Sequence, residues 1–189
     1  GRRRAAPQRL VSMDCREGYA EACARVASCT VPVALADPAT NAERVITQVR
    51  ACHEEGVAVA LFPELSLSGY AIDDLLMQDV LLDAVDEAVV TIAEATAKLL
   101  PLVVVGAPLR HGNRLYNCGV VIHRGEVLGV SPKSFLPNYR EFYEKRHFAS
   151  GAGHQGEFLV RPHWPGADVD GEIPFGPDLL FTADDHPDL

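Results

Sequence analysis

Two charged residues each follow a proline at the end of an apolar run, where they could perform acid-base chemistry. Glu64 lies in FPELSLSGY, residues 62–70, directly after the apolar run VAVAL. Lys133 ends the segment EVLGVSPK. A buried carboxylate can act as a general base, and a lysine held near it can stabilise a developing oxyanion. Together they are candidates for a site that activates a nucleophile.

A third candidate, Glu141, lies in the aromatic run YREFYEKRHF, whose rings could wall a pocket. Each candidate also has a structural interpretation. Glu64 could cap a strand end or form a surface ion pair, and Lys133 could be an ordinary solvated lysine. The aromatic run could equally face a partner or another domain. Residue types alone leave these alternatives open.

Other catalytic and binding patterns are weak or absent in the sequence. SGAGHQG fits G-x-G-x-x-G, but no strand precedes it and no helix follows, so a turn-rich loop is the better interpretation. The seven histidines show no H-E-x-x-H spacing, and no serine lies in G-x-S-x-G. The five cysteines form no C-x-x-C pair. Reduced thiols are expected, and no metal site.

The composition is that of a globular protein without a nucleic-acid surface. Hydrophobic residues make up 48% of the chain and charged residues 23%, and the net charge is -9. Phosphate contact needs a basic excess, which this chain lacks. No apolar stretch reaches the length of a membrane span, and the start of the chain lacks the apolar segment of a secretory signal. We expect a cytoplasmic protein with no membrane or nucleic-acid partner.

The elements that must position the candidates alternate between strands and helices. Residues 1–24 are expected to be a leader outside the conserved core. The apolar periodicity then predicts strands at 25–35, 57–62 and 102–108. It also predicts a helix at 37–56 capped by Asp37 and a helical stretch at 73–100 broken near Gln78. A hairpin should turn at Arg124 and Gly125. Loops and short strands should follow Pro137, with another strand beginning at DLLF, residues 178–181. This order predicts an α/β layered fold.

The segments FPELSLSGYAIDDLL and VVVGAPLRHGNRLYNCGVVIHRGEVLGVSPKSFLPNYREFYEKRHFASG resemble the nitrilase (carbon-nitrogen hydrolase) superfamily. Within it, LSGY-x-x-x-DLL and LPNYREFYEKRxF resemble the glutaminase domains of glutamine-dependent NAD synthetases. The resemblance implies a nitrilase-like four-layer α-β-β-α sandwich, truncated before the strand that carries the nucleophile. Residues 25–189 would form part of such a domain.

The resemblance also implies roles for individual residues. Glu64 matches the general base, and Lys133 matches the residue that stabilises the tetrahedral intermediate. Glu141 matches a second glutamate that orients the lysine and the substrate, and Tyr139 matches a residue that contacts glutamine. No cysteine here matches the family's nucleophile, which is expected beyond Leu189. This chain alone is therefore expected to be inactive.

For the intact protein, the resemblance implies glutamine hydrolysis that supplies ammonia for the ATP-dependent conversion of deamido-NAD to NAD. Glutamine and deamido-NAD are the expected small-molecule partners. ATP and Mg²⁺ are expected only in a C-terminal synthetase domain that this chain lacks, and the intact protein is expected to be a homo-oligomer. The alternatives are a stand-alone amidase or carbamoylase, and a non-catalytic module with the nitrilase fold.

Overall fold

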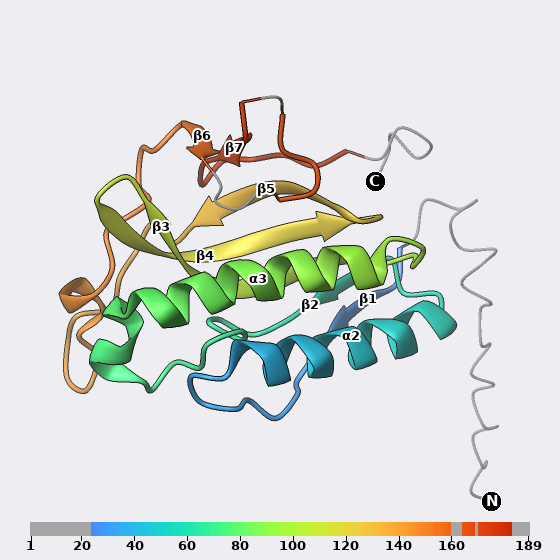
Figure 1. Cartoon of the computed structure of the whole chain (residues 1–189), viewed down its shortest axis with the longest axis horizontal. Helices are drawn as coiled ribbons and strands as arrows, with labels where there is room; N and C mark the ends of the chain where they lie inside the picture. The colour runs from blue at the N-terminus through green and yellow to red at the C-terminus, as the bar shows by residue number, and fades with distance from the viewer. Residues whose placement is uncertain (1–23, 160–163, 169, 183–189) are drawn as a thin grey trace, which may run out of the picture.

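The computed structural model describes residues 24–159, 164–168 and 170–182, which form one seven-stranded sheet with helices on one face (Figure 1). The strand order is β1-β2-β3-β4-β5-β7-β6. The strands are β1 (Val26–Ser28), β2 (Val59–Leu61), β3 (Leu102–His111), β4 (Arg114–His123), β5 (Glu126–Pro132), β6 (Gly156–Leu159) and β7 (Glu172–Phe175).

Helix α2 spans Pro38–Glu54 and begins as the sequence predicts. The Asp37 carboxylate accepts hydrogen bonds from the backbone N–H of Thr40 at 3.1 Å and from its hydroxyl at 2.7 Å. Pro38 suits the first turn of the helix because its missing N–H would have no partner there. The predicted face is buried, with Val45 and Val49 both 0% exposed.

The predicted helical stretch at 73–100 divides at Gln78, which confirms the expected break. A short 3₁₀ helix, η2 (Asp73–Met77), precedes α3 (Asp79–Thr96), and Gln78 between them is extended. Helix α3 stops four residues before the predicted Leu100. The ring of Pro101 disfavours the helical backbone conformation for the preceding residue, so the helix ends before Pro101.

Four strand predictions differ from the structure. Strand β3 runs to His111, three residues beyond the predicted end. Strand β1 is shorter than the predicted 25–35, because Pro32 cannot donate to a ladder and the chain after Ser28 becomes a loop. Strand β2 covers only the centre of the predicted 57–62. The DLLF segment at 178–181 forms no strand, and β7 at EIPF takes its place beside β5.

Strands β3, β4 and β5 form two consecutive hairpins. The predicted turn between β4 and β5 is confirmed, and Arg124 and Gly125 both have positive φ angles, 48° and 90°. Such a turn matches the right-handed twist of the flanking strands. A β-bulge between Val121 and Ile122 then shifts the pairing by one residue. This shift sets the backbone N–H of Lys133 2.8 Å from the carbonyl of Asn117.

The main core lies between the sheet and the layer formed by α2 and α3. Strand β3 presents Val105, and β4 presents Val120, towards apolar residues of both helices. The predicted α/β class is therefore confirmed. Of the four layers that the resemblance implies, the described residues form one sheet and one helical layer. Within these described ranges, no helix is long and apolar enough to cross a membrane.

A buried asparagine of α2 fastens the segment that follows Glu64. The Asn41 amide donates to the carbonyls of Ala34 at 2.8 Å and Leu67 at 2.9 Å, and its oxygen accepts the N–H of Ala34 at 2.7 Å. All its hydrogen-bonding groups are therefore used. The side chain thus ties the helix to the turn that carries the candidate base.

Replacing Asn41 with alanine should destabilise this domain by about 2–3 kcal/mol, because buried backbone groups lose their partners. Urea unfolding followed by circular dichroism would measure the loss. Asn113→Ala, at an exposed turn position, is the matched control and should stay within about 0.5 kcal/mol of wild type. Equal stability of the two variants would contradict the role of Asn41.

Candidate active site

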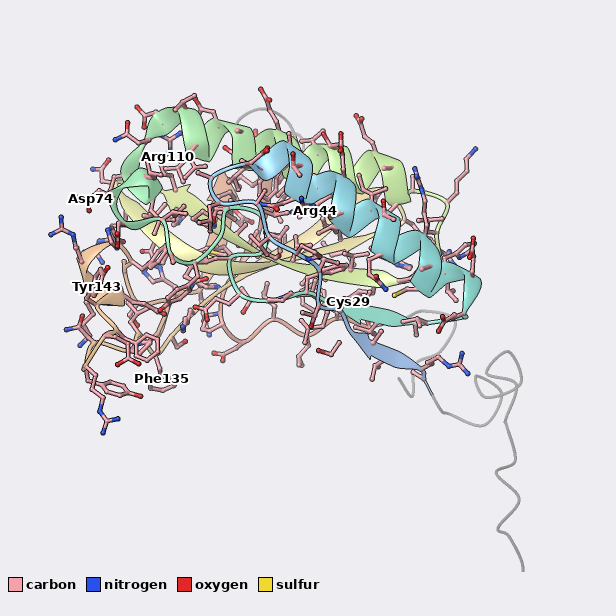
Figure 2. All side chains as sticks on the ribbon, turned by 90° about the horizontal axis from the view of Figure 1, so that it is seen from below. Cys29, Arg44, Asp74, Arg110, Phe135 and Tyr143 are labelled. Carbon is pink, nitrogen blue, oxygen red and sulfur yellow. The ribbon has the colours of Figure 1, made fainter. Side chains whose placement is uncertain are left out.

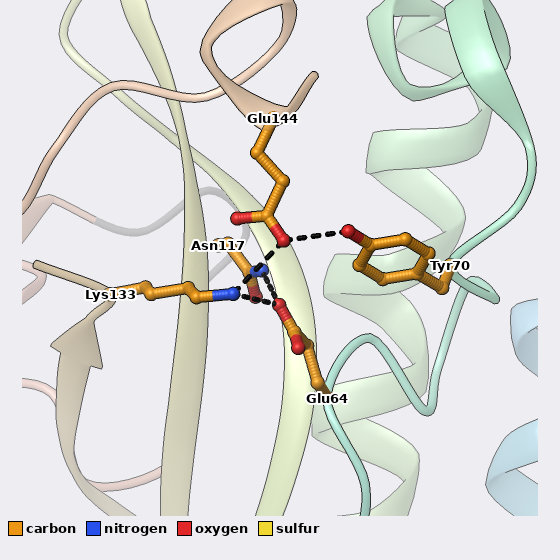
Figure 3. Close-up of polar contacts among 5 residues, drawn as sticks. All are labelled: Glu64, Tyr70, Asn117, Lys133 and Glu144. Carbon is orange, nitrogen blue, oxygen red and sulfur yellow. Dashed lines mark hydrogen bonds and ion pairs between the residues drawn. The ribbon is translucent and has the colours of Figure 1, made fainter. Parts of the chain in front are cut away.

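The sheet brings Glu64 and Lys133 together, because β2 and β5 run in the same direction and end at the same edge. The Lys133 amine donates to Oε1 of Glu64 at 2.6 Å and to Oε1 of Glu144 at 3.0 Å (Figure 3). A single ammonium thus bridges two carboxylates. The paired positions of Glu64 and Lys133 agree with the sequence prediction, and Glu144 is an addition to it.

Two neutral side chains complete the arrangement. The Asn117 amide donates to the same Glu64 oxygen that Lys133 contacts. The Tyr70 hydroxyl donates to Oε1 of Glu144 at 2.8 Å. Each carboxylate therefore receives the lysine and one neutral donor on the same oxygen, which fixes the orientation of both carboxylates relative to Lys133 (Figure 3).

The exposed fraction of the side chain differs sharply between the two carboxylates. The Glu144 side chain is 4% exposed, whereas Glu64 is 42% exposed. Burial alone would lower the pKa of the Lys133 amine, but its hydrogen bonds to both carboxylates outweigh burial and raise that pKa above its ordinary value. Lys133 therefore stays cationic through the neutral range. Burial, followed by the hydrogen bond to Glu144, raises the pKa of Tyr70, which remains a neutral donor.

Glu144 keeps one carboxylate oxygen free. Its Oε2 atom is buried and has no hydrogen-bond partner among the described residues. A buried oxygen of this kind is costly unless a donor reaches it. Glu144 therefore holds one unpaired acceptor inside the site, on the carboxylate whose other oxygen binds Lys133 and Tyr70.

The residue predicted to orient the lysine was Glu141, but the side chain beside Lys133 is Glu144, three residues further along. Glu141 is exposed and lines a neighbouring pocket of about 230 Å³. The physical reason is local. The chain makes a short 3₁₀ helix, η3 (Glu144–Arg146), and the backbone N–H of Glu144 bonds to the Pro137 carbonyl at 3.1 Å, which turns Glu144 inward.

The loop that carries Glu144 is fastened to η2 by surface contacts. Arg146 donates twice to the Asp74 carboxylate, at 3.0 and 2.8 Å, and His147 contacts the same group at 3.0 Å. The hydrogen bonds from Arg146 and then His147 lower the pKa of Asp74 to about 2. Tyr143 bonds to Asp73 beside them, and Figure 2 shows Asp74 and Tyr143 at the same end of the molecule.

A cleft of about 450 Å³ opens at this constellation. Its walls include the aromatic rings of Tyr139, Phe142 and Tyr70, together with Pro137, Glu64, Lys133 and Glu144. Tyr139 was predicted to contact the substrate, and it lies on the wall with 63% of its surface exposed. The cleft is therefore charged at its base and aromatic at its rim.

The three cysteines that the structure describes lie away from the cleft. Cys118 follows Asn117 in β4, so its side chain points to the opposite face of the sheet. It is buried, and burial raises its pKa. Cys29 and Cys52 are also buried, with their sulfur atoms 3.8 Å apart between the β1 end and α2. Cys15 and Cys23 lie outside the described residues.

The part of the chain that the structure describes holds no group of three or more metal-ligating side chains close enough for a metal ion. The G-x-G-x-x-G stretch also has a structural explanation. A Cβ at Gly151 would lie 2.6 Å from the Pro132 ring, and the Gly151 N–H donates to the Lys133 carbonyl at 2.9 Å. Gly151 therefore permits close packing behind Lys133.

Sequence reasoning missed three members of the site: Tyr70, Asn117 and Glu144. Tyr70 ends the same FPELSLSGY segment that contains Glu64 and belongs to the LSGY motif, but that motif assigned no contact to its hydroxyl. Asn117 is a polar residue inside an apolar strand, which could have marked it. Glu144 lies in the predicted aromatic run, and only the course of the loop distinguishes it from Glu141.

Comparisons with known proteins agree with this geometry. The family model for carbon-nitrogen hydrolases matches residues 25–172. A glutamine-dependent NAD(+) synthetase from Mycobacterium leprae is 52% identical over 173 residues, which is 92% of this chain and 24% of that protein. One from Mycobacterium tuberculosis strain H37Rv is 53% identical over 175 residues, which is 93% of this chain and 25% of that protein.

Solved structures show the same fold. A glutamine-dependent NAD(+) synthetase from Cytophaga hutchinsonii aligns with a TM-score of 0.74 and 28% identity, covering 86% of this chain and 26% of that chain. An amidase from Nesterenkonia sp. aligns with a TM-score of 0.57 and 22% identity, covering 72% and 51%. This chain thus spans about a quarter of the length of the curated relatives it matches. With the family model covering most of its length, the chain belongs to the carbon-nitrogen hydrolase family.

Proposed function

We propose that this cleft hydrolyses the side-chain amide of glutamine, as the glutaminase part of a glutamine-dependent NAD synthetase. The observation that carries the proposal is the Lys133 ammonium held 2.6 Å from Glu64 and 3.0 Å from Glu144 at the base of an aromatic-rimmed cleft. Identity above 50% to two mycobacterial synthetases supports the choice of glutamine.

In the proposed reaction, Glu64 takes the proton from a cysteine thiol, and the thiolate attacks the amide carbon. The carbonyl oxygen becomes an oxyanion, which Lys133 stabilises by its charge. The intermediate collapses when the C–N bond breaks, and Glu64 returns the proton to the departing nitrogen, which leaves as ammonia. Glu64 then activates a water that hydrolyses the thioester to glutamate and restores the thiol.

The neutral and buried groups hold this geometry during the cycle. Asn117 and Lys133 both donate to one oxygen of Glu64, so the other oxygen can face the thiol. Glu144 and Tyr70 hold the lysine from the opposite side. Tyr139 on the cleft wall would contact the rest of the glutamine.

Cys29, Cys52 and Cys118 are buried away from the cleft, and Cys15 and Cys23 precede Glu64, whereas the family resemblance implies a nucleophile that follows Lys133. On this proposal none of the five cysteines is the nucleophile. The purified 189-residue chain should therefore release no ammonia from glutamine above background, since no thioester can form. An enzyme-coupled ammonia assay would measure this. Turnover that survives blocking of all thiols would contradict the thioester route, and turnover by the untreated chain would contradict the position of the nucleophile.

The ammonia released would serve the ATP-dependent amidation of deamido-NAD in a separate synthetase domain. ATP and Mg²⁺ would bind in that domain and not in this cleft. The gene product that contains this chain is further expected to assemble as a homo-oligomer.

The direct test offers that gene product glutamine, asparagine, simple aliphatic amides and N-carbamoyl amino acids. We expect glutamine to have the highest kcat/KM by at least about tenfold, because its binding groups lie beyond the reacting amide. Preferred hydrolysis of a simple amide, with no formation of NAD from deamido-NAD and ATP, would instead support a stand-alone amidase. Absence of any amide hydrolysis would support a non-catalytic module.

A further inference from the structure

The turn that carries Glu64 crosses over strand β3 at Gly106. Strand β2 lies beside β3, whereas Asn117 and Lys133 belong to β4 and the end of β5, on the far side of β3. Glu64 can therefore reach its two donors only if the chain after β2 passes across β3. The backbone of this turn and the backbone of β3 must therefore approach closely.

Gly106 has no room for any side chain. A Cβ built there would lie 2.3 Å from the Leu65 nitrogen, 2.5 Å from the Pro63 oxygen and 2.8 Å from the Glu64 carbonyl carbon. All three are backbone atoms of the turn, so no side-chain rotation could relieve the overlap. Any larger residue at position 106 would displace the turn and Glu64 with it.

Hydrogen bonds hold the turn on Gly106. The Ser66 hydroxyl accepts the N–H of Gly106 at 3.1 Å and donates to its carbonyl at 3.4 Å. The N–H of Leu67 donates to the same carbonyl at 3.1 Å. Ser66 is 1% exposed, so these bonds form away from water. The backbone of Gly106 thus pairs with the turn as it would with a neighbouring strand.

The turn also adopts a strained backbone conformation. Leu65, immediately after Glu64, has a φ angle of 52°, which a residue with a side chain rarely adopts. Such a conformation persists only where its surroundings determine it. The contacts with Gly106 supply that determination on one side of the turn.

We propose that Gly106 and Ser66 hold the turn that places Glu64 against Lys133, and that both are positioning residues for amide hydrolysis. Neither touches the substrate, and each acts through the position of the Glu64 carboxylate. The inference rests on the proposed function for its kinetic readout. Its structural readout, the distance from Glu64 to Lys133, is independent of any activity.

The chain offers a matched control for each residue. Gly119 pairs with Gly106 across β3 and β4, but a Cβ there would meet only ordinary contacts, at 3.7 Å and 4.0 Å. Ser68 lies in the same turn, is 0% exposed, and bonds to the Gly69 carbonyl rather than to Gly106. Alanine at either control position should leave Glu64 in place.

The experiment compares Gly106→Ala with Gly119→Ala, and Ser66→Ala with Ser68→Ala, in the gene product that contains this chain. For glutamine hydrolysis, kcat should fall more than about 100-fold in Gly106→Ala and about tenfold in Ser66→Ala, with KM within twofold, because a small misplacement of a reacting group slows chemistry more than binding. Both controls should match wild type. Crystal structures should show the Glu64–Lys133 distance of 2.6 Å retained in Gly119→Ala and lost in Gly106→Ala.

Equal losses in Ser66→Ala and Ser68→Ala would overturn the inference, as would a folded Gly106→Ala variant that keeps Glu64 on Lys133. If Gly106→Ala does not fold, the serine pair alone decides. A wild-type protein that does not hydrolyse glutamine would refute the proposed function instead. In that case the crystallographic Glu64–Lys133 distance, measured also in Ser66→Ala, would still decide whether Gly106 and Ser66 position Glu64.

Discussion

Replacing Glu144 with glutamine should lower the kcat of glutamine hydrolysis about 100-fold in the gene product that contains this chain. The Glu144→Gln substitution keeps the size of the side chain but removes the negative charge that faces the Lys133 ammonium at 3.0 Å. The lysine would then turn towards Glu64 alone, and its position relative to the reacting carbonyl would change. Steady-state ammonia release would measure the loss.

Glu141→Gln is the control for this substitution, because it makes the same chemical change three residues earlier in the same loop. Its side chain is exposed and lies in the neighbouring pocket, so kcat should stay within about twofold of wild type. The reverse outcome, with Glu141→Gln inactive and Glu144→Gln active, would show that the loop is arranged differently in the working enzyme.

Replacing Lys133 with methionine should have a larger effect, a loss in kcat of about 1000-fold. The substitution removes the cation that we propose stabilises the oxyanion, and it leaves the Glu64 and Glu144 carboxylates without the counter-charge between them.

Lys145→Met tests whether the loss comes from the site rather than from charge in general. Lys145 is exposed in the same loop as Glu144, so its replacement should change kcat by less than about twofold. A Lys133→Met variant that retains more than a tenth of wild-type kcat while Lys145→Met is normal would contradict the proposed role of the lysine.

The predictions that came out correct rest on local patterns. Asp37 followed by Pro38 marks a helix start, and Arg124 with Gly125 marks a hairpin turn. The placement of Glu64 and Lys133 after apolar runs singled out two side chains that the structure joins at 2.6 Å, and their catalytic roles stay predictions. These signals depend on short-range chemistry, so one sequence is enough to read them.

The errors and omissions arise where the tertiary structure decides. Without the register shift opposite Val121 and Ile122, a two-residue turn would pair position 116 with Lys133, and Lys133 would face the opposite side of the sheet from Asn117. No residue pattern announces that shift. Likewise, Glu141 and Glu144 share one short run, and only the η3 turn against Pro137 buries the second of them.

Single-turnover hydrolysis of amide-labelled [¹⁵N]glutamine by wild type and Glu64→Gln would test whether Glu64 is the general base. We expect wild type to release labelled ammonia and Glu64→Gln to slow this chemical step by about 100- to 10,000-fold, because the general base is gone. Release of labelled ammonia by Glu64→Gln at a rate within threefold of wild type would contradict this role of Glu64.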